Sequence, residues 1–220
     1  MRTFVTIILF AFCQNAFCQE YFFDIFLEYE LKDNRKHLFM LNSSNEDYLF
    51  YCFNNSNEFQ GSIIDHKKCM IHYYSLDNNK NNNTIEFKYL YSEKDTKYWQ
   101  YQKKPCTIET EKYQVTKNEI DSLNQSFEII EFTNKRKKRI YQSVTINMMK
   151  LESKALPSIA YGFFKDLYLK CKIVNLPKGY IPTLIKINNF NKESSQMKLI
   201  QNKKINTTLS ISKEQVKFIE

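Results

Sequence analysis

The densest group of potential metal ligands in the chain is the segment 65–72 (DHKKCMIH). Imidazole, thiolate and carboxylate groups at such short spacings are typical of zinc and related metal sites. However, if Lys68–Leu76 continues as a strand, its successive residues point to opposite faces. His66 and His72 would then face away from Cys69 and lie about 20 Å apart, at roughly 3.3 Å per residue. Only a helix or a tight loop would bring these groups together around one metal, and we assign no metal-binding residue here.

Nucleophilic catalysis finds little support in the residue types. A catalytic cysteine needs a neighbouring base, and Cys69, the cysteine flanked by two histidines, is expected to face away from both. The chain has three glycines, Gly61, Gly162 and Gly179. Their positions exclude a glycine-rich phosphate-binding loop and a Gly-x-Ser-x-Gly elbow. We assign no catalytic and no cofactor-binding residue, expect no cofactor, and predict that the protein is not an enzyme.

Two further groups have suitable residue types without a distinctive spacing. Trp99, with Tyr98 and Tyr101, could stack on a sugar ring, but such clusters in β-rich proteins more often pack in the core or at a sheet edge. Carboxylate pairs such as Glu109 and Glu111 are sequence neighbours, which rarely form the facing pair of a glycosidase, about 5–9 Å apart. We favour packing for the first group and solvation for the second.

The most concentrated charge is the basic run 135–139 (KRKKR). It lies between two alternating apolar segments, 127–132 and 140–148, with a bend at 133–134, and this arrangement predicts a hairpin tip. Such a tip is either simply solvated or a contact for anionic lipid headgroups or acidic glycans. No aromatic RNA-binding motif accompanies the run, so we do not expect nucleic acid as a partner.

The first eighteen residues have the layout of a secretory signal peptide. Arg2 precedes the ten-residue stretch Phe4–Cys13, and small residues stand at positions −3 and −1 of a cut after Cys18. Ten residues are too few to cross a bilayer, and no later apolar run reaches ~18 residues, so we expect no transmembrane helix. Lipidation of Cys18 is the alternative, although the bulky residue before it departs from lipoprotein signals. We expect 19–220 to be exported to the periplasm, the outer membrane or the extracellular space.

Composition favours one folded domain over 19–220. The chain is 43% hydrophobic and contains 18 Phe, 15 Tyr and 1 Trp, which excludes a disordered chain. It has 32 basic and 24 acidic residues, and loss of Arg2 with the signal leaves 31 basic residues and a net charge of +7. The abundance of Lys and Asn is typical of an AT-rich genome, so the excess charge does not by itself indicate an anionic partner.

Four cysteines follow the signal: Cys52, Cys69, Cys106 and Cys171. In an oxidising compartment they allow three full disulfide pairings, and the sequence does not choose among them. Cys52 lies in the apolar segment 48–53, and Cys171 shares a strand face with Leu169 and Ile173. Both are equally well explained as buried thiols, so it stays open whether any bridge forms.

Hydrophobic alternation with a period of two dominates the exported part. It predicts strands over 22–31, 85–91, 139–148 and 167–174. Segment 48–53 is apolar on both faces, which is typical of a strand covered on both sides. Asparagine-rich segments such as 42–45 predict turns, and the capping box 116–119 predicts a short helix over 117–124. The fold class we expect is mainly β, an antiparallel meander forming a curved sheet or half-barrel with at most one or two short helices.

Several segments resemble uncharacterised exported proteins of flavobacteria (Bacteroidota), which are similar in outline to the lipoprotein-carrier (LolA-like) class. The segments are 17–19 (FCQ), 23–29 (FDIFLEY), 41–48 (LNSSNEDY), 61–65 (GSIID), 156–157 (LP) and 176–179 (LPKG). The resemblance covers mainly residues 20–75. It implies a half-barrel that wraps an apolar concavity and a place in the cell envelope, and it transfers no functional residue.

Together these features favour a non-catalytic cell-envelope protein. Its curved antiparallel sheet would bind a lipid or other apolar ligand, or an envelope protein, through faces rich in Phe and Tyr. The alternative is a structural or adhesive envelope protein that uses the basic hairpin at 135–139. The least favoured alternative is an exported hydrolase whose site is assembled from distant strands. The sequence indicates no oligomeric state.

Overall fold

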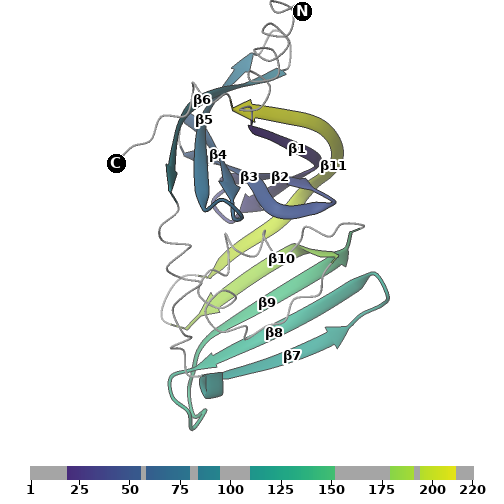
Figure 1. Cartoon of the computed structure of the whole chain (residues 1–220). Helices are drawn as coiled ribbons and strands as arrows, with labels where there is room; N and C mark the ends of the chain where they lie inside the picture. The colour runs from purple at the N-terminus through teal and green to yellow at the C-terminus, as the bar shows by residue number, and fades with distance from the viewer. Residues whose placement is uncertain are drawn as a thin grey trace, which may run out of the picture.

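The computed structural model describes residues 19–55, 58–79, 84–94, 110–151, 179–190 and 194–211. Eleven strands and one short 3-10 helix, η1 (Thr110–Lys112), make up this part of the chain (Figure 1). The strands are β1 (Gln19–Leu31), β2 (Lys36–Asn42), β3 (Asn45–Asn55), β4 (Glu58–Asp65), β5 (Met70–Asn79), β6 (Thr84–Lys94), β7 (Tyr113–Glu119), β8 (Asn124–Phe132), β9 (Ile140–Lys150), β10 (Tyr180–Asn189) and β11 (Ser195–Ile211).

All of these strands belong to one antiparallel sheet with the order β6-β5-β4-β3-β2-β1-β11-β10-β9-β8-β7. Strands that are neighbours in the chain pair throughout, except β6 and β7, which form the two edges of the sheet. The first and last strands, β1 and β11, pair with each other in the middle. The predicted fold class is therefore confirmed: the protein is mainly β, and its meander forms a curved, open sheet.

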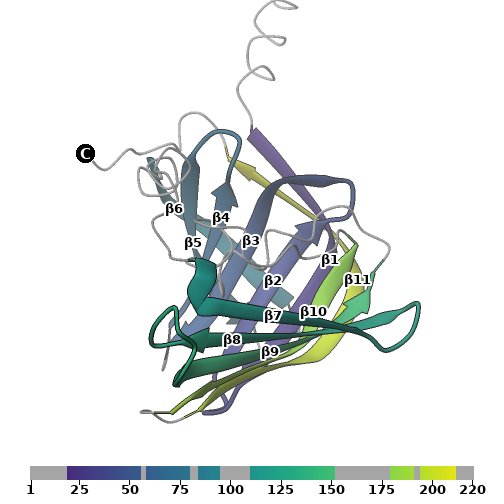
Figure 2. The ribbon, with the colours of Figure 1, turned by 90° about the horizontal axis from the view of Figure 1, so that it is seen from below.

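The sheet folds back on itself into two halves. β1–β6 and the end of β11 make a curled half, and β7–β10 with the beginning of β11 make a flat half (Figure 1). Seen from below, the strands of the flat half run across β1–β3 (Figure 2). The ladder between β1 and β11 has register shifts between Phe23 and Ile25 and between Glu28 and Tyr29. Such bulges bend strands, so β11 can pass from one half to the other.

The buried side chains of the described residues form two hydrophobic clusters. The seam cluster lies between the halves and consists of Ile25, Leu27, Tyr29, Phe39, Leu41, Leu49, Phe127, Ile129, Val144, Ile146, Met148, Ile181, Ile185 and Met197. The curl cluster lies inside the curled half and consists of Tyr21, Phe23, Met40, Phe50, Cys52, Ile63, Tyr74, Leu209 and Ile211. On β3, Leu49 faces the first cluster and Phe50 the second, which explains why segment 48–53 is apolar on both faces, as predicted.

The helix predicted over 117–124 is wrong. Residues up to Glu119 form β7, and Thr116 of the supposed capping box pairs with Glu128 of β8. The turn that follows is held by Asp121, whose Oδ1 accepts hydrogen bonds from the backbone N–H groups of Leu123 and Asn124, both at 2.7 Å. A ladder of main-chain bonds and the packing of β8 outweigh a local helix signal of a few residues.

Three of the other strand predictions are confirmed, and one falls on residues that the structure does not describe. Segments 22–31 and 85–91 fall within β1 and β6, and 139–148 matches β9 to within two residues at either end. The turn at 42–45 is also confirmed, because Asn42 Oδ1 accepts a hydrogen bond from the backbone of Ser44 at 2.8 Å. The strand predicted over 167–174 lies outside the described residues.

Residues 1–18 also lie outside the described part, so the signal peptide and its cut stay predictions. The same holds for the extent of the single domain. Across the described ranges, no helix is long and apolar enough to cross a membrane.

Candidate functional site

His72, considered above as a metal ligand, lies on β5 with only 1% of its surface exposed. It is the register partner of Ser92 on β6, so both side chains enter the curl together. Asp65 at the end of β4 and Tyr21 of β1 meet them there. With Tyr89 of β6 these residues form a group that we call the polar chain: Tyr21, Asp65, His72, Tyr89 and Ser92.

The hydrogen bonds of the polar chain run in one direction. The Tyr21 hydroxyl donates to Asp65 Oδ2 at 2.8 Å and lies 2.9 Å from His72 Nε2. Because a phenol has one proton, which here goes to the carboxylate, Nε2 must carry the hydrogen that joins His72 to Tyr21. Nδ1 of His72 then accepts from Ser92 Oγ at 2.6 Å, and Ser92 accepts from the Tyr89 hydroxyl at 2.7 Å. Each donor therefore gives one hydrogen bond, and the chain of bonds leads from Tyr89 to the carboxylate of Asp65.

Burial sets the charge of these groups. It lowers the pKa of His72 to about 4 and outweighs the Asp65 carboxylate, which acts in the opposite direction. Burial and the hydrogen bond to Asp65 raise the pKa of Tyr21 well above its ordinary value. His72 and Tyr21 are therefore both uncharged at neutral pH, as the direction of the hydrogen bonds requires.

The polar chain contains the residue types of a serine hydrolase in a different arrangement. The Tyr21 hydroxyl stands between the histidine and the aspartate, so no direct His–Asp bond orients the base. Ser92 is 0% exposed, and a substrate cannot reach its hydroxyl in this arrangement. The hydrogen bonds instead tie the start of β1 to β4, β5 and β6 across the curl.

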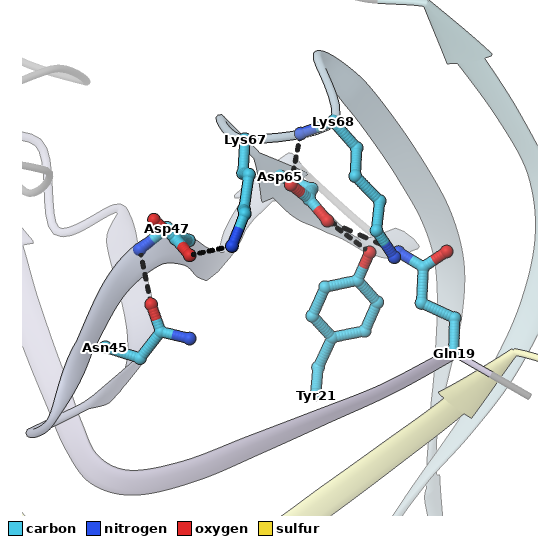
Figure 3. Close-up of polar contacts among 7 residues, drawn as sticks. All are labelled: Gln19, Tyr21, Asn45, Asp47, Asp65, Lys67 and Lys68. Atoms are coloured by element: carbon cyan, nitrogen blue, oxygen red, sulfur yellow. Dashed lines mark hydrogen bonds and ion pairs between the residues drawn. The ribbon is translucent and has the colours of Figure 1, made fainter.

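The turn between β4 and β5 supports the Asp65 carboxylate (Figure 3). Its Oδ1 accepts a hydrogen bond from the backbone N–H of Lys68 at 2.7 Å, while Oδ2 faces the polar chain and the Gln19 amide, 3.3 Å away. A second carboxylate in Figure 3, that of Asp47, forms an ion pair with Lys67 at 3.4 Å. Both carboxylates are thus engaged by groups of the protein itself.

The strand predicted from Lys68 begins only at Met70, and this places two candidate ligands in a turn. Cys69 has a φ of 54°, and its Sγ donates to the carbonyl of His66 at 3.7 Å. The expectation that Cys69 alternates with its flanking histidines along one strand is therefore wrong. Over the residues that the structure describes, no three His, Cys, Asp or Glu side chains gather where they could hold a metal ion.

Two of the four cysteines are visible as free thiols, Cys52 and Cys69. Cys52 belongs to the curl cluster, and burial raises the pKa of its thiol to about 12, so it is packed and unreactive. Cys106 and Cys171 lie outside the described residues. A bridge between these two is the pairing that stays open.

A pocket of about 510 Å³ opens at the waist of the molecule, where β11 passes from the flat half to the curled half. This waist pocket lies between the middle of β1, the turn after β2, the end of β9 and the middle of β11. Its apolar wall is formed by Ile25, Leu151 and Ile205. The first two pack in the seam cluster and the third on the curl cluster, so the pocket opens over their junction.

The waist pocket carries an excess of positive charge. It is lined by the exposed residues Lys150, Lys203 and Lys204, and no ion pair involves them within the described chain. Lys203 Nζ lies 4.7 Å from the centre of the Phe26 ring. The carboxylate on the wall, that of Asp24, already accepts hydrogen bonds from the backbone N–H of Ser43, at 2.7 Å, and from its hydroxyl. The ammonium groups are therefore available to an anion from outside.

The remaining sequence candidates fall at the far end of the flat half or outside the described residues. The basic run 135–139 forms the exposed turn between β8 and β9, which confirms the predicted hairpin tip. Glu111 is exposed on η1, and its carboxylate pairs with Lys135 at 2.8 Å. Trp99 and its two tyrosine neighbours, like Glu109, lie outside the described part.

Neither the polar chain nor the waist pocket was found by sequence reasoning. The signal for the first was a His and a Ser inside apolar alternation, and the lysines of the second come from distant parts of the chain. Comparison with known proteins assigns no family: no protein-family model matches the chain, and no curated protein is significantly similar to it.

Proposed function

We propose that this chain is an exported, non-catalytic protein of the cell envelope that binds an anionic amphiphile in the waist pocket. The ligand has an apolar chain and one acidic group. The observation that carries the proposal is the position of the pocket, which has exposed lysines on one side and the junction of two hydrophobic clusters on the other. Apolar walls with a few polar groups that fix orientation are typical of ligand sites.

The size and charge of the waist pocket define the class of ligand. A volume of about 510 Å³ lies in the usual range for small-molecule sites. Lysine ammonium groups bind carboxylate and phosphate as point charges without a fixed geometry, so either head group fits. The apolar wall favours a hydrocarbon chain over a sugar.

The waist pocket is also the better place for a ligand than the centre of the curl. A half-barrel of the lipoprotein-carrier class would hold its ligand in the concave face. Here that face is filled by the protein's own rings, including Tyr21, Phe23 and Phe50, each at most 2% exposed. An amphiphile bound at the waist needs none of these rings to move.

Two further points support the proposal. The signal-like segment 1–18 predicts export to a compartment where lipids are the common amphiphiles. The hydroxyl of Ser92, the group nearest to a hydrolase nucleophile, is closed to solvent. Binding therefore accounts for the described features better than catalysis does.

Titration calorimetry of the mature chain, residues 19–220, with dodecanoate and with dodecanol tests the proposal. Dodecanoate should bind, and the triple variant Lys150→Gln, Lys203→Gln, Lys204→Gln should bind it roughly tenfold more weakly, since each exposed ion pair is worth about 0.5 kcal/mol. Dodecanol should bind weakly to both proteins.

The matched control removes the same charge elsewhere, by Lys88→Gln, Lys94→Gln and Lys186→Gln on β6 and β10. These three lysines are exposed and do not line the pocket. The control should bind dodecanoate as the unmodified chain does. The proposal would be refuted if the triple variant at Lys150, Lys203 and Lys204 bound dodecanoate as tightly as the unmodified chain does. It would also be refuted if the unmodified chain bound dodecanol as tightly as dodecanoate.

A further inference from the structure

The far end of the flat half combines exposed basic and exposed apolar side chains. β8 ends and β9 begins there, β10 ends beside them, and the whole edge lies at the lower left of Figure 1. Phe190, just after β10, donates its backbone N–H to the carbonyl of Tyr141 on β9 at 3.4 Å, so the two residues are neighbours. We call this surface the hairpin end: residues 133–141 together with Phe190.

The hairpin end has five basic side chains, and one of them, Lys135, pairs with Glu111 at 2.8 Å. Lys137 folds back, with its Nζ 3.5 Å from the Tyr113 carbonyl and 5.7 Å from the centre of the Phe132 ring. Arg136, Lys138 and Arg139 are exposed and form no ion pair with any part of the chain that the structure describes. Their charges therefore lie at one end of the sheet and face solvent.

Apolar side chains stand beside these charges instead of being buried. Phe190 is 63% exposed, Tyr141 39% and Ile140 36%. A solvated turn gains nothing from such residues, and a purely electrostatic contact with a soluble polyanion does not need them. Basic residues next to exposed aromatic and aliphatic side chains are typical of surfaces that lie in the interface of an anionic bilayer.

We propose that the hairpin end docks this protein on the surface of a bilayer that contains anionic lipids. Arg136, Lys138 and Arg139 contact the headgroups, and Phe190 with Tyr141 enters the boundary between headgroups and acyl chains. The contact is independent of the waist pocket, because the two lie at opposite ends of β9, about 30 Å apart along the strand. A docked molecule thus presents the pocket away from the bilayer.

Vesicle co-sedimentation of the mature chain tests the docking. The vesicles contain phosphatidylethanolamine with phosphatidylglycerol, or phosphatidylcholine alone. Binding should require phosphatidylglycerol and should weaken between about 0.1 M and 1 M salt, where the Debye length falls from about 10 Å to about 3 Å. The triple variant Arg136→Gln, Lys138→Gln, Arg139→Gln should bind roughly a hundredfold more weakly, since each basic residue contributes roughly a fivefold gain in partitioning.

A second variant separates a bilayer from a soluble acidic glycan. Phe190→Ser keeps every charge and should weaken vesicle binding by about tenfold, through loss of apolar burial, while leaving any binding to heparin unchanged. The control Lys88→Gln, Lys94→Gln, Lys186→Gln should bind vesicles as the unmodified chain does, and circular dichroism should show that all variants are folded. Vesicle binding that is unchanged in either the basic triple variant or Phe190→Ser overturns the proposal.

Discussion

The curled half and the flat half come from one meander, yet their interiors are built from different side chains. In the seam cluster, 3 of the 14 buried residues are aromatic, whereas in the curl cluster 4 of 9 are aromatic. The rings of the curl meet edge to face, as Phe50 does with Phe87 at 5.5 Å and 84°. The polar chain also belongs to the curl alone.

Geometry explains this difference. Two sheets that face each other lie about 10 Å apart, and aliphatic side chains of ordinary length fill that space from both sides. A single sheet that curls must span its own interior, which favours large rings and hydrogen-bonded polar groups that reach across. The curled half therefore contains a buried histidine, His72, whereas the buried residues of the seam cluster include none.

The largest expected effect of this contrast is a loss of stability of the curled half at acidic pH. In the folded protein the pKa of His72 is about 4, against an ordinary value of 6.5. Between these values the unfolded chain binds a proton that the folded chain does not, so the free energy of unfolding falls as the pH drops. The full loss is roughly 3 kcal/mol. Hydrogen exchange with mass spectrometry should show β4–β6 losing protection at about pH 5 while β8–β10 keep theirs.

The variant His72→Gln sharpens this prediction, because Gln keeps a donor and an acceptor but does not titrate. It should remove most of the pH dependence in this range, at some cost in stability at neutral pH. His37→Gln is the matched control and should leave most of the dependence in place, since His37 lies outside the polar chain. Equal loss of protection in both halves on acidification would contradict the comparison.

A smaller effect is expected where the rings of the curl leave no room. A Cβ atom added at Gly61 would overlap the Phe50 ring and lie 2.9 Å from Leu76 Cδ1. Gly61→Ala should therefore lower the free energy of unfolding by about 1–3 kcal/mol in urea denaturation. The neighbouring Ser62→Ala, on the other face of β4, should change it by about 0.5 kcal/mol at most. A Gly61→Ala variant as stable as the control would mean that the curl is loosely packed.

The smallest effect is expected at the hairpin end of the flat half. Phe190 is 63% exposed, so Phe190→Ser should change the free energy of unfolding by no more than about 0.5 kcal/mol. Thermal and urea denaturation would both measure this. A loss above about 1 kcal/mol would show that Phe190 packs in the flat half, and its exposure would then need no partner to explain it.

The two halves also differ in how much of their structure could be predicted from the sequence. The hairpin formed by β8, the basic run and β9 was predicted almost residue by residue, because alternation and a polar bend are local signals. The capping box at 116–119 is local too, and it failed because β8 pairs along that whole segment. In the curl, the alternation placed β6 correctly, but it could not show that Ser92 faces His72. The sequence of a single strand does not determine its register with the neighbouring strand.

The order of the residues alone was enough to decide the strand period, the turns rich in asparagine and the exposed basic tip. Each depends on the backbone preferences and polarity of adjacent residues. The pairing of β1 with β11, the neutral state of His72 and the waist pocket were decided only in the folded chain. Asp24, Lys150 and Lys204 line one pocket because burial of the two hydrophobic clusters brings distant strands together. The free energy gained by this burial comes from contacts across the whole sheet, so no single segment of the sequence reveals it.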